Sequence, residues 1–139
     1  MADTRNFQLQ VISPDRIFYD GEVDMVEVRT TEGEMGIYAD HIPLTAIIAP
    51  GILRIHENGE VKEAALLSGF IEIQKKRVTI LAESCEWPEE IDVNRAEEAK
   101  VRAERRLKGA EGAINEMRAE LALRRSLTRL SLADKKNNK

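Results

Sequence analysis

The residue chemistry of this 139-residue chain changes sharply near Pro88. Residues 1–88 carry 8 basic and 15 acidic side chains, a net charge of −7, whereas residues 89–139 carry 13 basic and 10 acidic side chains, a net charge of +3. All six aromatic residues, all four prolines and six of the eight glycines lie in the first part. This asymmetry predicts two structural units, residues 1–88 and 89–139, with different partners.

The first unit has the pattern of short β-strands. Apolar and polar residues alternate over Phe7–Val11, Val26–Arg29 and Val78–Ile80, as in half-buried strands. Asn58-Gly59 fits a type I′ hairpin turn, which requires positive φ at both residues. Turn dipeptides recur at short intervals: Asp20-Gly21, Glu32-Gly33, Pro50-Gly51, Asn58-Gly59 and Ser68-Gly69. We therefore expect an antiparallel β-sandwich or barrel.

The second unit has the pattern of two helices. The first follows Asp92 and carries a narrow stripe of small residues: Ala96, Ala99, Ala103, Leu107 and Ala110. The segment Gly109–Gly112 interrupts the pattern, which then resumes with Ile114, Met117, Leu121, Leu123, Leu127 and Leu130. A short glycine-containing link predicts an antiparallel helical hairpin. The four alanine methyls of the first stripe contribute only ~3 kcal/mol on burial, so a hairpin that opens is physically plausible.

Several functional classes are disfavoured by what the sequence lacks. It has no phosphate-binding glycine loop, no nucleophile elbow and no HExxH pair. A single cysteine, Cys85, and two histidines make a metal site improbable, and Cys85 is expected to be a buried small residue. The net charge of −4 argues against nucleic-acid binding, and no apolar run approaches the ~20 residues of a membrane span. A non-catalytic contact role is therefore favoured.

One group of charged residues allows two interpretations. Asp92, Arg95 and Arg102 lie on the first helix, whereas Arg125 and Arg129 share one face of the second. Antiparallel packing would gather up to four guanidinium groups near a helix N-terminus, an arrangement suited to a polyphosphate, with Glu86 available to accept from a base or ribose. From spacing alone the ordinary solvated charged face is favoured, with Asp92 as a helix N-cap.

The chain resembles the epsilon subunit of the bacterial F-type ATP synthase over essentially its full length. The similar segments occur in the family's order: VISPD from Val11, GEMGI from Gly33, HIPL from His41, GIL from Gly51, GFIEI from Gly69, VTILA from Val78, IDVNRA from Ile91, AERRL from Ala103 and RAELALRRSLTRL from Arg118. The resemblance implies a β-sandwich followed by a helical hairpin. It also implies docking of the sandwich on the gamma subunit and on the membrane rotor ring of c subunits, with Glu34 and His41 in the rotor-ring contact.

In the resembled family the hairpin is regulatory. Extended, it blocks ATP hydrolysis in the catalytic head of alpha and beta subunits; folded down, it permits hydrolysis. The residues implied to face an acidic segment of the beta subunit are Arg118, Arg124, Arg125 and Arg129. The residues that match the family's ATP-contact positions are Glu86, Ile91, Asp92, Arg95, Arg102, Arg125 and Arg129. The resemblance therefore favours ATP as a regulatory ligand and reverses the solvated-face interpretation.

Alternatives and departures from the family pattern remain at this point. Trp87-Pro88, immediately before the hairpin, is less usual in the family and is expected to stiffen the linker, and a generic helical-hairpin adaptor is disfavoured by the ordered motifs of the first unit. The hairpin could belong to a purely structural coupling subunit that does not sense nucleotide; a free-standing nucleotide-binding enzyme is less compatible with the missing motifs. The expected location is the cytoplasmic face of a bacterial plasma membrane, peripheral to it and without membrane insertion. Ser68 stands where family members often have a glycine, a change expected to affect only a local turn.

Overall fold

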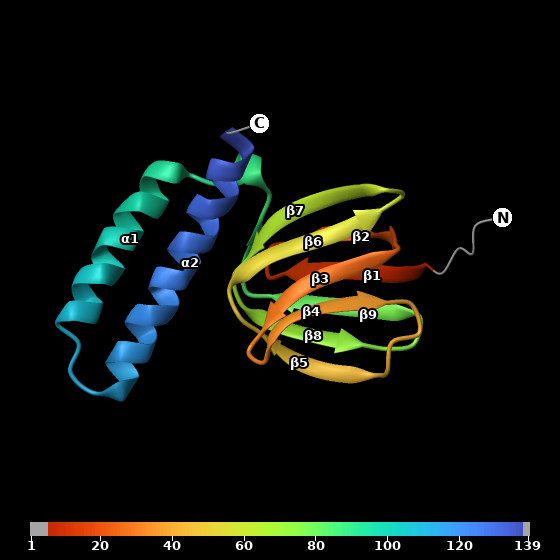
Figure 1. Ribbon diagram of the computed structural model, residues 1–139, viewed down its shortest axis with the longest axis horizontal. Helices are drawn as coiled ribbons and strands as arrows, with labels where there is room; N and C mark the ends of the chain where they lie inside the picture. Colours follow the sequence, from red (N-terminus) through yellow and green to blue (C-terminus); the bar gives the residue numbers. More distant parts are fainter. Residues whose placement is uncertain (1–5, 138–139) are drawn as a thin grey trace.

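Short strands occupy the chain as far as Glu86, and helices follow. The computed structural model describes residues 6–137 (Figure 1). The strands are β1 Phe7–Ser13, β2 Arg16–Val23, β3 Met25–Thr30, β4 Gly33–Tyr38, β5 Leu44–Ile48, β6 Gly51–Glu57, β7 Glu60–Leu66, β8 Gly69–Ile73, β9 Arg77–Ala82 and β10 Cys85–Glu86. A 3-10 turn, η1, spans Pro88–Glu90, and the helices are α1 Val93–Lys108 and α2 Ala113–Asn137. The predicted β-sandwich followed by a helical hairpin is confirmed.

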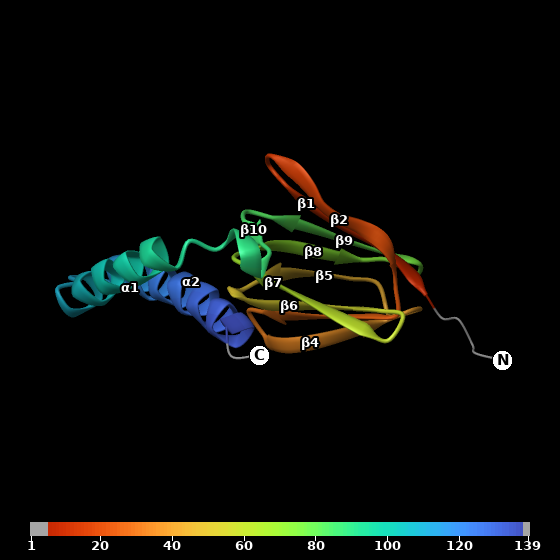
Figure 2. The ribbon, with the colours of Figure 1, turned by 90° about the horizontal axis from the view of Figure 1, so that it is seen from above.

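The strands form a continuous hydrogen-bonded path that folds into two facing layers (Figure 2). The order along the path is β10-β7-β6-β3-β5-β8-β9-β1-β2, and β4 pairs with β3. Alternate side chains point into the space between the layers, because successive residues of a strand face opposite sides. In β1, for example, Phe7, Leu9 and Val11 are buried, as the alternation predicted.

One strand pair departs from the antiparallel expectation. β1 and β9 run parallel, with Leu9 opposite Val78 and Val11 opposite Ile80, whereas the other ladders among the described residues are antiparallel. Two strands so far apart in sequence need no tight turn between them, so the local pattern did not reveal their direction. The predicted Asn58-Gly59 turn is confirmed: both residues have positive φ, 51° and 82°, and they join β6 to β7.

The helices form an antiparallel hairpin, and the side chains buried between them are mostly small. Asp92 is the N-cap of α1, and its carboxylate accepts a hydrogen bond of 3.2 Å from the Arg95 backbone N–H. The buried residues of the hairpin include Ala96 and Ala103 of α1 and Ala119 and Ser126 of α2. The Ser126 hydroxyl is satisfied by the Ala122 carbonyl at 3.2 Å.

The predicted packing face of α2 is partly wrong. Ile114, Met117, Leu121 and Leu127 are 38–69% exposed instead of buried. Small side chains let the two helices approach closely, and the larger side chains of α2 then project away from α1. An apolar strip of α2 is therefore left facing solvent.

The hairpin contacts one end of the sandwich and extends away from it (Figures 1 and 2). A small apolar cluster joins the units: Ala65, Leu67, Ile91, Leu132 and Ala133, with Ile52 packed against them. None of the helices within residues 6–137 has the length and apolar character needed to cross a membrane.

Candidate functional site

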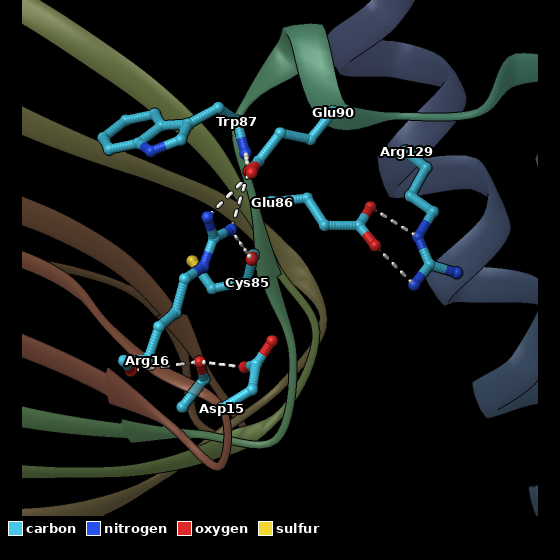
Figure 3. Close-up of polar contacts among 8 residues, drawn as sticks. Asp15, Arg16, Cys85, Glu86, Trp87, Glu90 and Arg129 are labelled. Carbon is cyan, nitrogen blue, oxygen red and sulfur yellow. Dashed lines mark hydrogen bonds and ion pairs between the residues drawn. The ribbon is translucent and has the colours of Figure 1, made fainter.

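A two-pronged ion pair joins the sandwich to α2. The Arg129 Nε donates to Glu86 Oε1 at 2.9 Å, and its Nη2 donates to Oε2 at 3.1 Å (Figure 3). Both side chains are about three-quarters buried, with 28% and 26% exposure. Bidentate arginine–carboxylate pairs have a fixed mutual orientation and are among the stronger hydrogen-bonded contacts in proteins. The pair therefore fixes the position of α2 relative to β10.

The alternation of side chains along β10 directs the Glu86 side chain toward α2. β10 pairs with β7, Cys85 opposite Leu66 and Glu86 opposite Ala65. The Cys85 side chain points into the sandwich core and is 5% exposed, so Glu86 must point outward. The expected buried position of Cys85 is confirmed, and burial raises the pKa of its thiol to about 12, which disfavours a nucleophilic role.

Two further ion pairs also join a carboxylate of the sandwich to a basic side chain of α2. Arg125 lies 3.7 Å from Glu83, and the Lys135 ammonium donates to Glu63 at 2.9 Å. Glu63 also accepts from Arg54 at 3.0 Å. Burial acts to raise the pKa of Glu63, but its contacts with Lys135 and Arg54 outweigh burial and hold that pKa below its ordinary value. The acidic first unit and basic second unit thus meet as complementary surfaces.

The predicted nucleotide-contact residues are brought together only in part. Glu86 and Arg129 are bonded to each other, Arg125 lies one turn earlier on α2, and Ile91 belongs to the joining apolar cluster. On α1, Asp92 caps the helix, and Arg95 and Arg102 are exposed. The start of α1 lies beside the end of α2 (Figure 1), so these arginines are on the hairpin but not in one closed pocket.

The arginines predicted to face the catalytic head fall into two groups. Arg118 and Arg124 are exposed on α2. Arg125 and Arg129 are engaged with Glu83 and Glu86. Only the first group is available to a partner while the hairpin is docked on the sandwich.

The two residues predicted for the rotor-ring contact are not brought together. Glu34 begins β4 next to Arg29, 3.3 Å away, at the helix end of the sandwich. His41 follows the other end of β4, and its Nδ1 lies 2.8 Å from the Ile42 carbonyl oxygen. The intervening strand alone spans about 13 Å, so Glu34 and His41 lie on opposite ends of the sandwich.

Sequence reasoning missed five contact residues: Arg16, Glu90, Glu83, Glu63 and Lys135. Arg16 and Glu90 form a two-pronged pair although they are 74 residues apart in the sequence. Glu63 and Lys135 are separated by 72 residues. No local spacing signals such pairs, and the charge asymmetry between the units was interpreted as a sign of different partners, not of contact between the units. Among the described residues no cluster of His, Cys, Asp or Glu is suited to hold a metal ion.

Comparison with known proteins places both units in one family. Residues 6–88 match the model of the ATP synthase delta/epsilon chain β-sandwich domain, and residues 89–134 match that of the long α-helix domain of the same chain. This chain is 47% identical over 132 residues to the ATP synthase epsilon chain of Caldanaerobacter subterraneus subsp. tengcongensis, covering 94% of this chain and 96% of that protein. The chain belongs to the ATP synthase epsilon-chain family.

Two further comparisons agree with this assignment, one by sequence and one by fold. The Shouchella clausii epsilon chain is 46% identical over 129 residues, covering 93% of this chain and 96% of that one. A chain in the Euglena gracilis mitochondrial ATP synthase shares the fold, with a TM-score of 0.78 at 24% identity, covering 96% of this chain and 84% of that chain. Family membership confirms the resemblance seen in the sequence and the expectation of a non-catalytic ATP synthase subunit.

Proposed function

We propose that this epsilon chain is a central-stalk subunit of a proton-translocating ATP synthase that couples rotation to ATP synthesis. Its hairpin is proposed to bind ATP when folded down and to inhibit ATP hydrolysis when extended. The sandwich would dock on the gamma subunit and the c-subunit ring, and the extended hairpin would contact the beta and alpha subunits. The proposed location is the cytoplasmic face of a bacterial plasma membrane, as a peripheral subunit.

The observation that carries the nucleotide proposal is the Glu86–Arg129 junction. It places a carboxylate of the sandwich and a guanidinium of α2 in direct contact at the interface that must part when the hairpin extends. Arg125 lies one turn away, and Arg95 and Arg102 are exposed on the neighbouring helix. Guanidinium groups suit a polyphosphate, and Glu86 could accept from a ribose once a nucleotide takes its place beside Arg129. The side-chain chemistry therefore fits ATP.

An exposed apolar row supports the docking proposal. Ile47, Phe70, Leu81 and Ile12 are cross-strand neighbours on β5, β8, β9 and β1, and Ile17 of β2 continues the row. Four of these five are more than half exposed, Ile12 being half-buried. A contiguous apolar row on a soluble surface is typical of a protein interface, and we assign it to the gamma subunit.

The tip beyond β4 is the stronger candidate for the ring. Ile42 is 78% exposed and Tyr38 is 60% exposed, both beside His41. Glu34 lies at the other end of the sandwich, so the c-subunit ring would contact both Glu34 and His41 only if it reached both ends of the sandwich. We therefore assign the ring contact to the His41 end and retain Glu34 as a separate contact to be tested.

ATP titration of the full chain, followed by calorimetry and by Trp87 fluorescence, tests the nucleotide proposal. A saturable response is expected, and Arg95→Ala or Asp92→Ala should abolish it. Arg106→Ala is the matched control because Arg106 is exposed on α1 but outside the predicted contact set. No response at millimolar ATP, with inhibition of hydrolysis retained in the reconstituted enzyme, would favour the purely structural coupling subunit.

A further inference from the structure

The segment between the two units is held to the sandwich by Arg16 of β2. The Arg16 Nη1 and Nη2 donate to the two carboxylate oxygens of Glu90, both at 2.7 Å (Figure 3). Nη2 also donates to the Cys85 carbonyl at 3.3 Å. One guanidinium thus contacts both ends of the segment Cys85–Glu90.

Further contacts attach the same segment to β2. The Trp87 ring stacks on Phe18 with centroids 4.2 Å apart, and the Arg16 guanidinium lies 5.0 Å from the Phe18 ring centroid. The Trp87 backbone N–H donates to the Glu90 carboxylate at 2.8 Å. The Glu90 carboxylate thus accepts hydrogen bonds both from the start of the 3-10 turn and from Arg16. The Arg16–Glu90, Arg16–Cys85 and Trp87–Phe18 contacts join the linker to β2, the others lie within the linker or within β2, and none of them involves α1 or α2.

Contacts with α2 are made by Glu86, which is bonded to Arg129, by η1 and by the next residue along the chain, Ile91. Ile91 packs with Leu132 and Ala133 of α2 as well as with Ala65 and Leu67 of the sandwich. Asp92 then caps α1. Extension of the hairpin would remove α2 from Ile91, but it would break none of the contacts that attach the linker to β2.

We propose that the Arg16–Glu90 pair is a clamp that keeps Cys85–Glu90 attached to the sandwich in both positions of the hairpin, so that the hairpin pivots at Ile91–Asp92. This inference rests on the proposed mobility of the hairpin but not on nucleotide binding. The clamp makes Arg16 a positioning residue. It holds the Glu86 carboxylate where Arg129 can bond to it, so that α2 docks on the same carboxylate each time the hairpin folds down. Without the clamp the pivot would move back to Ser84 or Cys85.

Amide hydrogen exchange of the full chain, without nucleotide, tests the clamp. The reporters are the backbone N–H groups of Trp87 and Glu90, which are bonded to the Glu90 carboxylate and the Trp87 carbonyl. Arg16→Gln should raise their exchange rates about tenfold or more, since charge-assisted hydrogen bonds are lost. Glu90→Gln keeps an acceptor for Trp87 and should give a smaller rise. Arg29→Gln is the matched control, because Arg29 pairs with Glu34 on the sandwich at similar exposure without contacting the linker.

The pivot is tested by forcing the hairpin off the sandwich. Leu132→Glu places a carboxylate at a site that is 1% exposed, which the docked state cannot accommodate without a large cost. The clamp predicts that Trp87 and Glu90 stay protected in Leu132→Glu and lose protection when Arg16→Gln is added. Loss of protection in Leu132→Glu alone would overturn the proposal, and so would full protection in the double variant. Both results are independent of ATP binding, so failure of the clamp and failure of the nucleotide proposal are distinguishable.

Discussion

Leu132→Ala should separate the hairpin from the sandwich without unfolding either one. Leu132 is 1% exposed and is the largest α2 side chain in the cluster that joins the two units. Truncating a fully buried leucine to alanine typically costs about 2–5 kcal/mol. The remaining apolar members from α2 and the linker are only Ala133 and Ile91.

The ion pairs across the interface cannot compensate for that loss. The pairs of α2 with Glu83 and Glu63 are partly exposed, and such pairs contribute only ~0–1 kcal/mol each. The bidentate Glu86–Arg129 pair is stronger, but it is already present in the unchanged chain and does not replace the lost apolar contact. The docking equilibrium should therefore shift by roughly 30- to 4000-fold, taking about 2–5 kcal/mol as the cost and 1.4 kcal/mol per factor of ten. The sandwich has its own core and should keep its unfolding transition.

Backbone ¹⁵N relaxation measures this directly, because an undocked hairpin tumbles with a correlation time different from that of the sandwich. Leu127→Ala is the matched control: it removes the same atoms from the same helix at a residue that is 45% exposed. It should leave a single correlation time for both units. If Leu132→Ala also tumbles as one body, or if Leu127→Ala undocks the hairpin equally, the assigned interface is wrong.

Five other outcomes follow from individual residues. Ser68 has φ +141°, a conformation that favours glycine, so Ser68→Gly should stabilise the chain by about 1 kcal/mol in urea unfolding; at Gly69 an added Cβ would lie 2.0 Å from the Leu81 carbonyl oxygen, so Gly69→Ala should destabilise it strongly. Native Cys85 should react with a thiol reagent at pH 8 at least 100-fold more slowly than in urea, because its pKa is raised to about 12 and it is buried; comparable rates would contradict this. The ionised Glu63 carboxylate, whose pKa is lowered in the docked state, stabilises docking at pH values above the ordinary carboxylate pKa of ~4.3. This contribution should be lost as the pH falls through the lowered pKa of the docked state. When docking is followed by relaxation against pH, Glu63→Gln should remove that acid transition. Phe70→Gln should weaken binding to purified gamma subunit at least tenfold while Ile114→Gln, on exposed α2, leaves it unchanged; equal effects would refute the assigned face.

Elements whose formation depends on near neighbours could be predicted from the sequence. Period-two alternation located β1, and the Asn58-Gly59 pair specified its turn because both residues readily adopt positive φ. Asp92 was identified as an N-cap, and the glycines near residue 110 as the end of the first helix. The charge difference between the units is likewise visible in the residues alone, and in the folded chain it takes the form of the α2 ion pairs.

Elements that depend on distant partners were decided by the tertiary structure. The close packing of alanines turned Ile114, Met117 and Leu121 outward, which a count of apolar spacing could not reveal. β4 carried Glu34 and His41 to opposite ends, although their sequence positions suggested one loop. Glu86 met Arg129 across 43 residues, and Arg16 met Glu90 across 74. The two units, most of their strands and helices, and the family could be predicted from the residues alone, because each rests on local periodicity or ordered motifs. Which charges meet, and where the hairpin is anchored, depends on how the layers close in space, and only the folded chain determines that.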